Sequence, residues 1–411
     1  MSYFQVFNLL RPAKRAFVFF AIISVALNAC ADGNQTSTVH VVRDKQIQVP
    51  FPPEFSAPPA VTYMQFRHLD WSAVTGEIAA SAAQGSWVYI VNPETGATRT
   101  IRAALRGGSR PLTWVPNTRL LMAEGGWQNI YGNVQVYDTA GDLSKPVMSD
   151  LMNARAAVKG ITLPDGQPAF VSLGEPKVSS VENGTKYFAY IHAGPEWKPV
   201  QKIQVFPNDG TAYHIQQAAL TKTPEGVFAA IHALQVIKSG SVRLPDGSWQ
   251  KPVTREDVWI VNLSTKKTLC QIDVYEGDPT TDGRSNSSSS YGVGISKGGQ
   301  WMAISTGKMF DLYDAKTCKR LYRLNDRESK YPRGAGFISP VFTPDDKYLI
   351  LVGVDVRTSK GGYLNVWRVA DGKLIYHDEE LHPQALTVDP NSRRFVVGHD
   401  QGQLTFFHIE D

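Results

Sequence analysis

The chain is poor in cysteine, in charge and in long apolar runs. It has three cysteines among 411 residues, and its 42 basic residues nearly balance 38 acidic ones, for a formal net charge of +4. A near-neutral surface has no electrostatic reason to attract nucleic acid, so we expect no nucleic-acid partner. After residue 30, no apolar run approaches the ~18 residues of a membrane-spanning helix. A hydrophobic content of 42% excludes a wholly disordered chain.

Short motifs of familiar enzyme chemistry are also missing. The sequence contains no Gly-x-Ser-x-Gly serine elbow, no phosphate-binding loop, no Cys-x-x-Cys pair and no haem signature. Sustained helical periodicity is absent after residue 30. We therefore expect no cofactor, and the sequence favours a binding protein over an enzyme.

The first 30 residues have the organisation of a secretory signal. A positive stretch at 11–15 precedes an apolar stretch at 16–27. The segment ends in Leu-Asn-Ala-Cys30, which resembles the lipobox of bacterial lipoproteins. The resemblance implies that residues 1–30 are a lipoprotein signal peptide and that Cys30 is lipidated. Ala31, in place of Asp, resembles an outer-membrane sorting signal, so we expect a lipid-anchored protein of the bacterial envelope that faces the periplasm.

Residues 31–60 are polar and then rich in proline, which is typical of a semi-stiff tether. The folded part is therefore expected at 61–411. Besides Cys30, the chain has Cys270 and Cys318, each after a turn in neighbouring repeats. We expect their Cα atoms to lie beyond disulfide reach, as two separate half-buried thiols.

Self-similar segments fill residues 61–411. Seven apolar runs each stop at a polar turn or at the chain end, and each follows another short apolar run, a turn and a first strand. In the third unit, YFAYIHA (187–193) is predicted as the second strand and IQVFPNDGT (203–211) as the third. Four strands in each of seven units predict an all-β, seven-bladed β-propeller of antiparallel blades. A pair of β-sandwiches is the alternative.

Two phrases in these repeats resemble those of a known family. The segments that begin at Asp314 (Asp-x-x-Thr-x-Lys) and Thr343 (Thr-Pro-Asp) are similar to phrases of WD-repeat and YVTN-like bacterial propellers. The resemblance covers about residues 61–411 and implies the fold alone. The chain departs from the full Gly-His…Trp-Asp signature, because Arg368 follows Trp367 where that signature has Asp.

The seventh unit ends at its third strand, because the sequence stops at Asp411. A propeller must close or leave an unpaired edge. We expect an N-terminal strand, either Val39–Arg43 or Val61–Phe66, to supply the missing outer strand.

The connections predict two unlike faces. Turns between first and second strands, and between third and fourth strands, share one face and are mostly tight, whereas the longer insertions fall on the other. Loops on a rigid scaffold commonly carry binding sites, so the insertion-rich face is the predicted binding face. The insertions are Glu124–Gly132, Lys145–Lys177, Gly194–Lys198, Leu234–Arg255, Tyr275–Ser290, Asn325–Gly336 and Asp355–Gly362.

Six side chains in these insertions are candidates for that face. Aromatic loop residues are common interface anchors, although they can also fold back onto their own loops. Arginines there could pair with an acidic partner, although solvated arginines are common. The candidates are Trp127, Tyr131, Trp197, Trp249, Arg333 and Arg357.

Three histidines give a sharper chemical hypothesis. His192, His232 and His399 are predicted at equivalent ends of second strands in units three, four and seven. Imidazoles around a propeller mouth could hold a metal or catalyse proton transfer, or they could form local hydrogen bonds.

Three function classes therefore stay open. The first is a scaffold or assembly factor with a monomeric head that binds an envelope protein. The second is a lyase or hydrolase, with or without a metal, at the axial mouth. The third is a carbohydrate- or peptide-binding module.

Overall fold

We describe the fold from a computed structural model. It describes residues 39–50, 66–82, 87–102, 111–125, 133–151, 157–174, 188–207, 212–238, 242–243, 249–250, 253–274, 292–305, 310–324, 335–337, 340–355 and 362–411. One compact unit spans His40–Glu410. None of the helices within these ranges is long and apolar enough to span a membrane.

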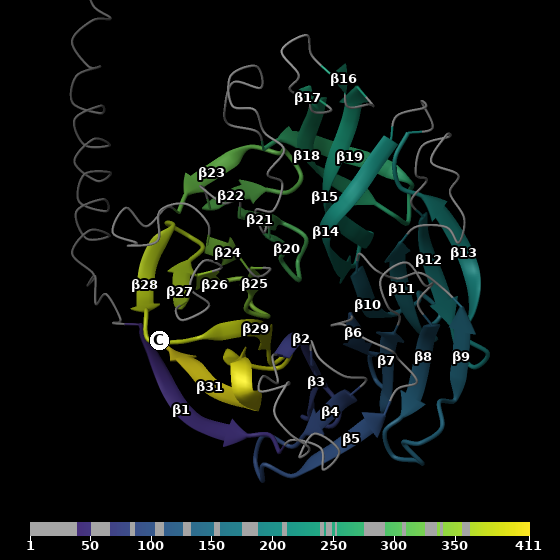
Figure 1. The fold of residues 1–411 in the computed structure, drawn as a ribbon, viewed down its shortest axis with the longest axis vertical. Coiled ribbons are helices and arrows are strands. Elements are labelled where there is room, and N and C mark those ends of the chain that lie inside the picture. Colours follow the sequence, from purple (N-terminus) through teal and green to yellow (C-terminus); the bar gives the residue numbers. More distant parts are fainter. Residues whose placement is uncertain are drawn as a thin grey trace, which may run out of the picture. The chain divides into compact units, whose positions relative to one another are not determined.

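Seven antiparallel sheets surround a common axis and form a β-propeller (Figure 1). In each blade we call the strands a to d, from the axis outward. Blade 1 comprises β2 (Phe66–Trp71), β3 (Ile78–Ala82), β4 (Trp87–Val91) and β5 (Thr98–Arg102). Blade 2 comprises β6 (Leu112–Trp114), β7 (Leu120–Gly125), β8 (Asn133–Asp138) and β9 (Met148–Leu151). Blade 3 comprises β10 (Ala157–Thr162), β11 (Pro168–Gly174), β12 (Phe188–Ala193) and β13 (Lys198–Gln204).

The remaining blades repeat this order with two additions. Blade 4 comprises β14 (Ala212–Thr223), β15 (Gly226–Lys238), β18 (Val253–Asn262) and β19 (Lys267–Asp273), with a hairpin of β16 (Val242–Arg243) and β17 (Trp249–Gln250) between β15 and β18. Blade 5 comprises β20 (Gly292–Ile295), β21 (Trp301–Ser305), β22 (Phe310–Asp314) and β23 (Arg320–Arg323). Blade 6 comprises β24 (Ala335–Phe337) and β25 (Val341–Phe342), both paired with β26 (Tyr348–Asp355), then β27 (Gly362–Arg368) and β28 (Lys373–Asp378). Blade 7 comprises β29 (Pro383–Val388), β30 (Arg394–His399) and β31 (Gln403–Glu410), with a short helical turn η3 (Asp400–Gly402) before β31, and β1 (His40–Gln48).

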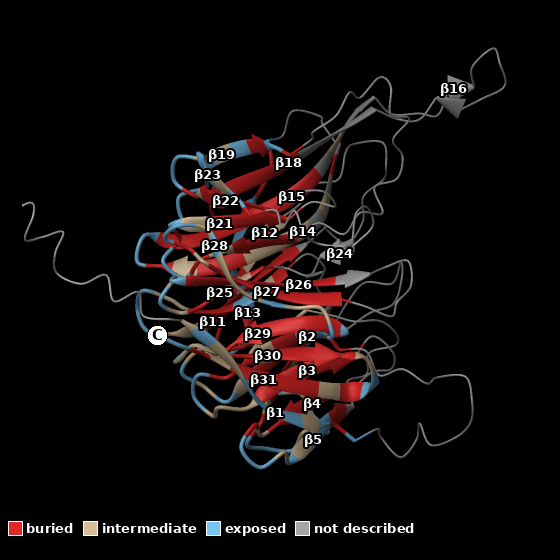
Figure 2. Ribbon diagram, turned by 90° about the vertical axis from the view of Figure 1, so that its left-hand side faces the viewer, coloured by how far each residue is buried: buried red, intermediate tan, exposed pale blue. Residues whose placement is uncertain are grey.

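The apolar second strands explain why the chain forms blades. Side chains on both faces of a central strand are covered by neighbouring blades, as in β3, where every residue is buried. Short runs without polar alternation are expected for such strands. The hydrophobic clusters accordingly lie between adjacent blades, as for Tyr137 of blade 2 with Ile90 of blade 1. Figure 2 shows this burial running through the strands rather than in one central core.

Glycines allow two pairs of inner strands to approach closely near the axis. A Cβ on Gly160 of blade 3 would overlap the carbonyl oxygen of Trp114 in blade 2. In the same way, a Cβ on Gly294 of blade 5 would overlap the carbonyl oxygen of Pro340, between β24 and β25 of blade 6. The Gly160 N–H donates to Thr113 Oγ1 at 2.9 Å, which fixes the approach of blades 2 and 3. These positions therefore require glycine for space.

The N-terminal strand closes the ring. β1 pairs with β31 from His40 opposite Glu410 to Gln48 opposite Gln403. The prediction of closure by an N-terminal strand is confirmed. Of the two segments predicted to close the ring, Val39–Arg43 is the one that pairs, from His40 onward. The strand continues to Gln48, through residues that were predicted to belong to the tether.

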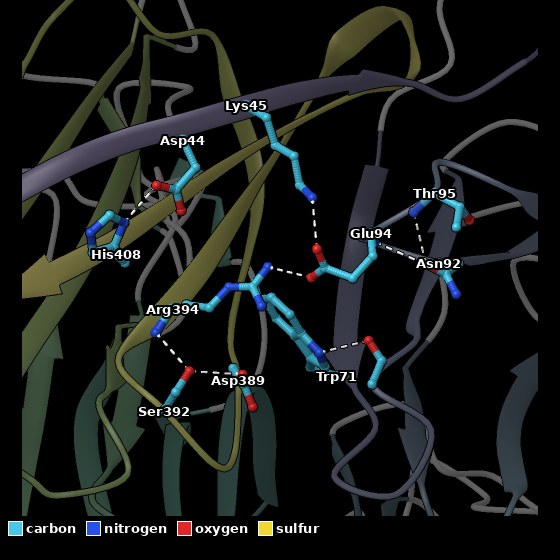
Figure 3. Close-up of polar contacts among 11 residues, drawn as sticks. Asp44, Lys45, Trp71, Asn92, Glu94, Thr95, Asp389, Ser392, Arg394 and His408 are labelled. Carbon is cyan, nitrogen blue, oxygen red and sulfur yellow. Dashed lines mark hydrogen bonds and ion pairs between the residues drawn. The ribbon is translucent and has the colours of Figure 1, made fainter.

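A network of polar side chains joins β1 to the first and the last blade of the ring (Figure 3). Glu94, in the turn after β4, accepts from Arg394 at 2.9 Å and from Lys45 of β1 at 3.3 Å. His408 of β31 lies 2.5 Å from Asp44 and 2.8 Å from Glu410. Hydrogen bonding to Glu410, followed by that to Asp44, raises the pKa of His408. Blades 1 and 7 are thus joined by side chains as well as by the strand.

The strand directions separate two faces. The a-to-b and c-to-d connections lie on one, which we call the turn face, and the b-to-c and d-to-a connections lie on the other, the loop face. On the turn face, tight turns close through backbone hydrogen bonds, as from Gly76 N to Ser72 O at 3.1 Å. Its exposed turns follow one side of the ring (Figure 2). The connections at 175–187, 239–252, 275–291 and 325–334 belong to the loop face.

The third blade corrects the predicted strand order. Within the segment predicted as the second strand, Phe188–Ala193 forms β12, which is a third strand, and β11 is the second strand of this blade. The predicted insertion Lys145–Lys177 is therefore wrong, because it contains β9, β10 and β11. The predicted insertion Gly194–Lys198 is also wrong in its face, because it follows a c strand and so forms a turn of the turn face.

Candidate functional site

Blade 4 extends farther than the other blades toward the loop face. β15 has 13 residues and β14 has 12, whereas β3 has five. The outer strand β19 pairs with β18 only from Asp257 to Asn262. Beyond Asp257, the described part of the blade is therefore a three-stranded ribbon, which the hairpin β16–β17 follows.

Aromatic packing anchors this ribbon to blade 3. Tyr213 of β14 is buried and stacks on Phe206 with ring centroids 4.4 Å apart and an interplanar angle of 11°. Trp259 of β18 meets Phe206 edge-on at 5.6 Å. The predicted insertion Leu234–Arg255 is thus in part a continuation of β15 and β18 on a rigid base.

The predicted binding-face residues have different outcomes. Trp249 lies on β17, and nothing is described of its side chain. Trp127, Tyr131, Arg333 and Arg357 lie outside the described residues. Whether these five side chains form a binding surface therefore stays a prediction.

Trp197 is not a binding-face residue, and this prediction is wrong. It lies in the turn between β12 and β13, on the turn face, and is 5% exposed. Its ring stacks with Phe170 at 6.0 Å and 19°, and its backbone N–H donates to Ala193 O at 2.9 Å. The indole fills the junction between blades 2 and 3.

The three histidines do not gather at a mouth. His232 and His399 lie on b strands of blades 4 and 7, whereas His192 lies on a c strand of blade 3, so their positions are not equivalent. All three are buried. Over the described ranges, no group of three His, Cys, Asp or Glu side chains could hold a metal ion. The hypothesis that these histidines form one metal site is therefore wrong.

Their surroundings fit a structural role. Burial lowers the pKa of His232 to about 4. Burial is also the largest cause that lowers the pKa of His399 to about 4, so both imidazoles are neutral near pH 7. His399 Nε2 is 2.8 Å from Thr405 Oγ1. The His192 ring stacks on Phe170 at 4.6 Å, with Nε2 3.2 Å from Ser172 Oγ. Local packing and hydrogen bonds thus account for His192 and His399.

The two remaining cysteines form a disulfide, contrary to the sequence prediction. Cys270 of β19 and Cys318, in the turn after β22, have Cα atoms 6.0 Å apart. This separation is within the usual range for a disulfide. The prediction failed because it compared equivalent positions in two neighbouring blades. In the structure, the outer strand of blade 4 lies beside the turn that precedes the outer strand of blade 5.

Cations surround this disulfide on the turn face. The turn before β19 carries exposed Lys266, β19 begins with exposed Lys267, and the turn before β23 carries exposed Lys316 and Lys319. Sequence reasoning missed this group because it compared loop lengths rather than the charges of the turns. The pattern Lys-Lys in one repeat and Lys-x-x-Lys in the next was visible in the sequence.

Comparison with known proteins adds no identification. The chain matches no protein-family model, and no curated protein is significantly similar to it. The resemblance to WD-repeat and YVTN-like propellers is thus supported for the fold alone.

Proposed function

We propose that the protein is a lipid-anchored envelope scaffold that binds another protein through its loop face. One observation carries this proposal: the long connections and the extended blade 4 share one face of a ring whose other face has mostly tight turns. A rigid ring with connections concentrated on one face is the usual way in which a scaffold presents a binding surface.

Two further observations support the anchor and the compartment. The sequence of residues 1–30 is organised as a lipoprotein signal, with Cys30 as the lipidated residue. The disulfide between Cys270 and Cys318 suits an oxidising compartment, because cytosolic thiols are kept reduced. These observations support the proposal of an envelope location, and Ala31 after Cys30 supports an outer-membrane anchor that faces the periplasm.

The loop face is tested by shortening blade 4. Replacing residues 239–252 with Asn-Gly would join β15 to β18 by a two-residue turn where Lys238 pairs with Val253. We expect a partner captured from solubilised membranes by the full chain to be lost, with thermal unfolding unchanged. In the described part of the chain, β16 and β17 pair with each other and with no strand of the blade, so their removal leaves the pairing of blade 4 intact.

A shortened turn on the opposite face is the matched control. Replacing residues 140–146, in the turn between β8 and β9, with Asn-Gly removes a similar surface loop from blade 2. This control should keep the partner. Equal capture by both variants would assign binding elsewhere and contradict the proposal.

A further inference from the structure

The N-terminal segment joins the ring on the turn face. His40, the first residue of β1, pairs with Glu410 at the turn-face end of β31, whereas Val49 N donates to Gly402 O at the loop-face end. Only residues 31–39 separate Cys30 from β1. From Cys30 to His40, a chain of this length spans at most about 35 Å when fully extended. An anchor at Cys30 would therefore hold the turn face close to the bilayer.

The blade 4–5 junction gives that face a basic patch. We define the turn-face patch as Lys266, Lys267, Lys316, Lys319 and Arg320, all exposed. The Cys270–Cys318 disulfide joins the two segments that carry these cations, each made of a turn and the start of the outer strand that follows it. The five charges are thus presented by a cross-linked surface rather than by independent loops.

Nearby carboxylates offset the patch only in part. Lys316 Nζ pairs with Glu225 at 2.7 Å, and the buried Asp311 accepts from Arg323 at 3.0 Å and lies 3.5 Å from Arg320. Asp314 accepts from the backbone N–H groups of residues 316 and 317. Glu225 thus offsets one lysine of the patch, and Asp311 is shared between Arg320 and Arg323, so the patch has more cations than the carboxylates that pair with it in the described residues.

Exposed leucines accompany the cations. Leu269 of β19 is 40% exposed and Leu321 of β23 is 37% exposed. Each lies within three residues of a lysine of the patch. Basic side chains beside apolar ones suit the boundary between headgroups and acyl chains.

We propose that the turn-face patch docks on anionic phospholipid headgroups of the membrane that holds the anchor. The loop face then points away from that membrane, toward its protein partner. This inference rests on the proposed lipid anchor, because the short segment between Cys30 and His40 brings the patch to the bilayer.

Vesicle binding tests the patch without the anchor. Residues 31–411 contain every strand of the ring and lack Cys30. We expect this chain to sediment with vesicles of phosphatidylglycerol and phosphatidylcholine (about 1:1) and to bind phosphatidylcholine vesicles at least about tenfold more weakly. The triple variant Lys266→Glu, Lys267→Glu, Lys319→Glu should lose at least about tenfold in affinity for the anionic vesicles.

A second triple variant separates the patch from overall charge. Lys145→Glu, Lys347→Glu, Lys373→Glu makes the same charge change at exposed positions in blades 2 and 6. It should bind anionic vesicles nearly as well as the parent. An equal loss in both variants would overturn the proposal, and so would parent binding to poly-glutamate with none to vesicles, which would indicate an acidic protein partner.

The proposal and the proposed function fail in different ways. Loss of vesicle binding leaves capture of a partner by the loop face unaffected. Capture that survives shortening of blade 4 leaves the vesicle result unaffected.

Discussion

Reduction of the Cys270–Cys318 disulfide should lower the free energy of unfolding by about 4 kcal/mol. The bond closes a loop between residues 48 positions apart, and cross-linking a loop of that length removes this much chain entropy from the unfolded state. The bond also joins β19 of blade 4 to the turn after β22 of blade 5. Urea unfolding with and without dithiothreitol measures the difference.

The double variant Cys270→Ser, Cys318→Ser is the control. It should resemble the reduced parent and should not respond to dithiothreitol. Free thiols at both positions in the unreduced protein, together with the same stability in both conditions, would contradict the disulfide. The bond would then no longer support an oxidising compartment.

Replacing Gly160 with alanine should destabilise the ring by about 3 kcal/mol. The added Cβ would overlap the Trp114 carbonyl oxygen, so the inner strands of blades 2 and 3 would have to separate. That separation would weaken the hydrogen bond from Gly160 N to Thr113 Oγ1. Equilibrium unfolding in urea measures the loss.

Gly141→Ala provides the matched comparison, because Gly141 lies in the turn between β8 and β9 of blade 2. Its Cβ would meet Asp138 atoms at 3.6 to 4.0 Å, which is ordinary contact. We expect a change within about 0.5 kcal/mol. If Gly160→Ala proved as mild as Gly141→Ala, the close approach of blades 2 and 3 would be refuted.

The repeat and its closure could be predicted from the sequence because their signals are local. A strand buried on both faces is a short apolar run, as in β3 and β30, and the tight turns have distinct Asn, Asp and Gly residues. The missing fourth strand of blade 7 followed from the need to avoid an open edge. β1 met that need.

The third blade could not be assigned in the same way. YFAYIHA resembles VFAAIHA of blade 4, although the first is a c strand and the second a b strand. Both are apolar because both are covered by neighbouring blades, so composition does not distinguish them. The error moved His192 to the wrong strand and Trp197 to the wrong face.

The contacts between neighbouring blades could not be predicted from the sequence, for a different reason. The disulfide and the turn-face patch depend on how an outer strand lies beside the next blade's turn, which no local pattern specifies. Most of the predicted binding-face residues lie outside the described residues, so they stay predictions.

Photo-crosslinking in native membranes tests the division of roles between the two faces most directly. A photoreactive amino acid would replace Gln250, on the loop-face hairpin, or Thr268, exposed beside the turn-face patch. The account predicts protein adducts from position 250 and phospholipid adducts from position 268. Phospholipid adducts from position 250 together with protein adducts from position 268 would contradict it.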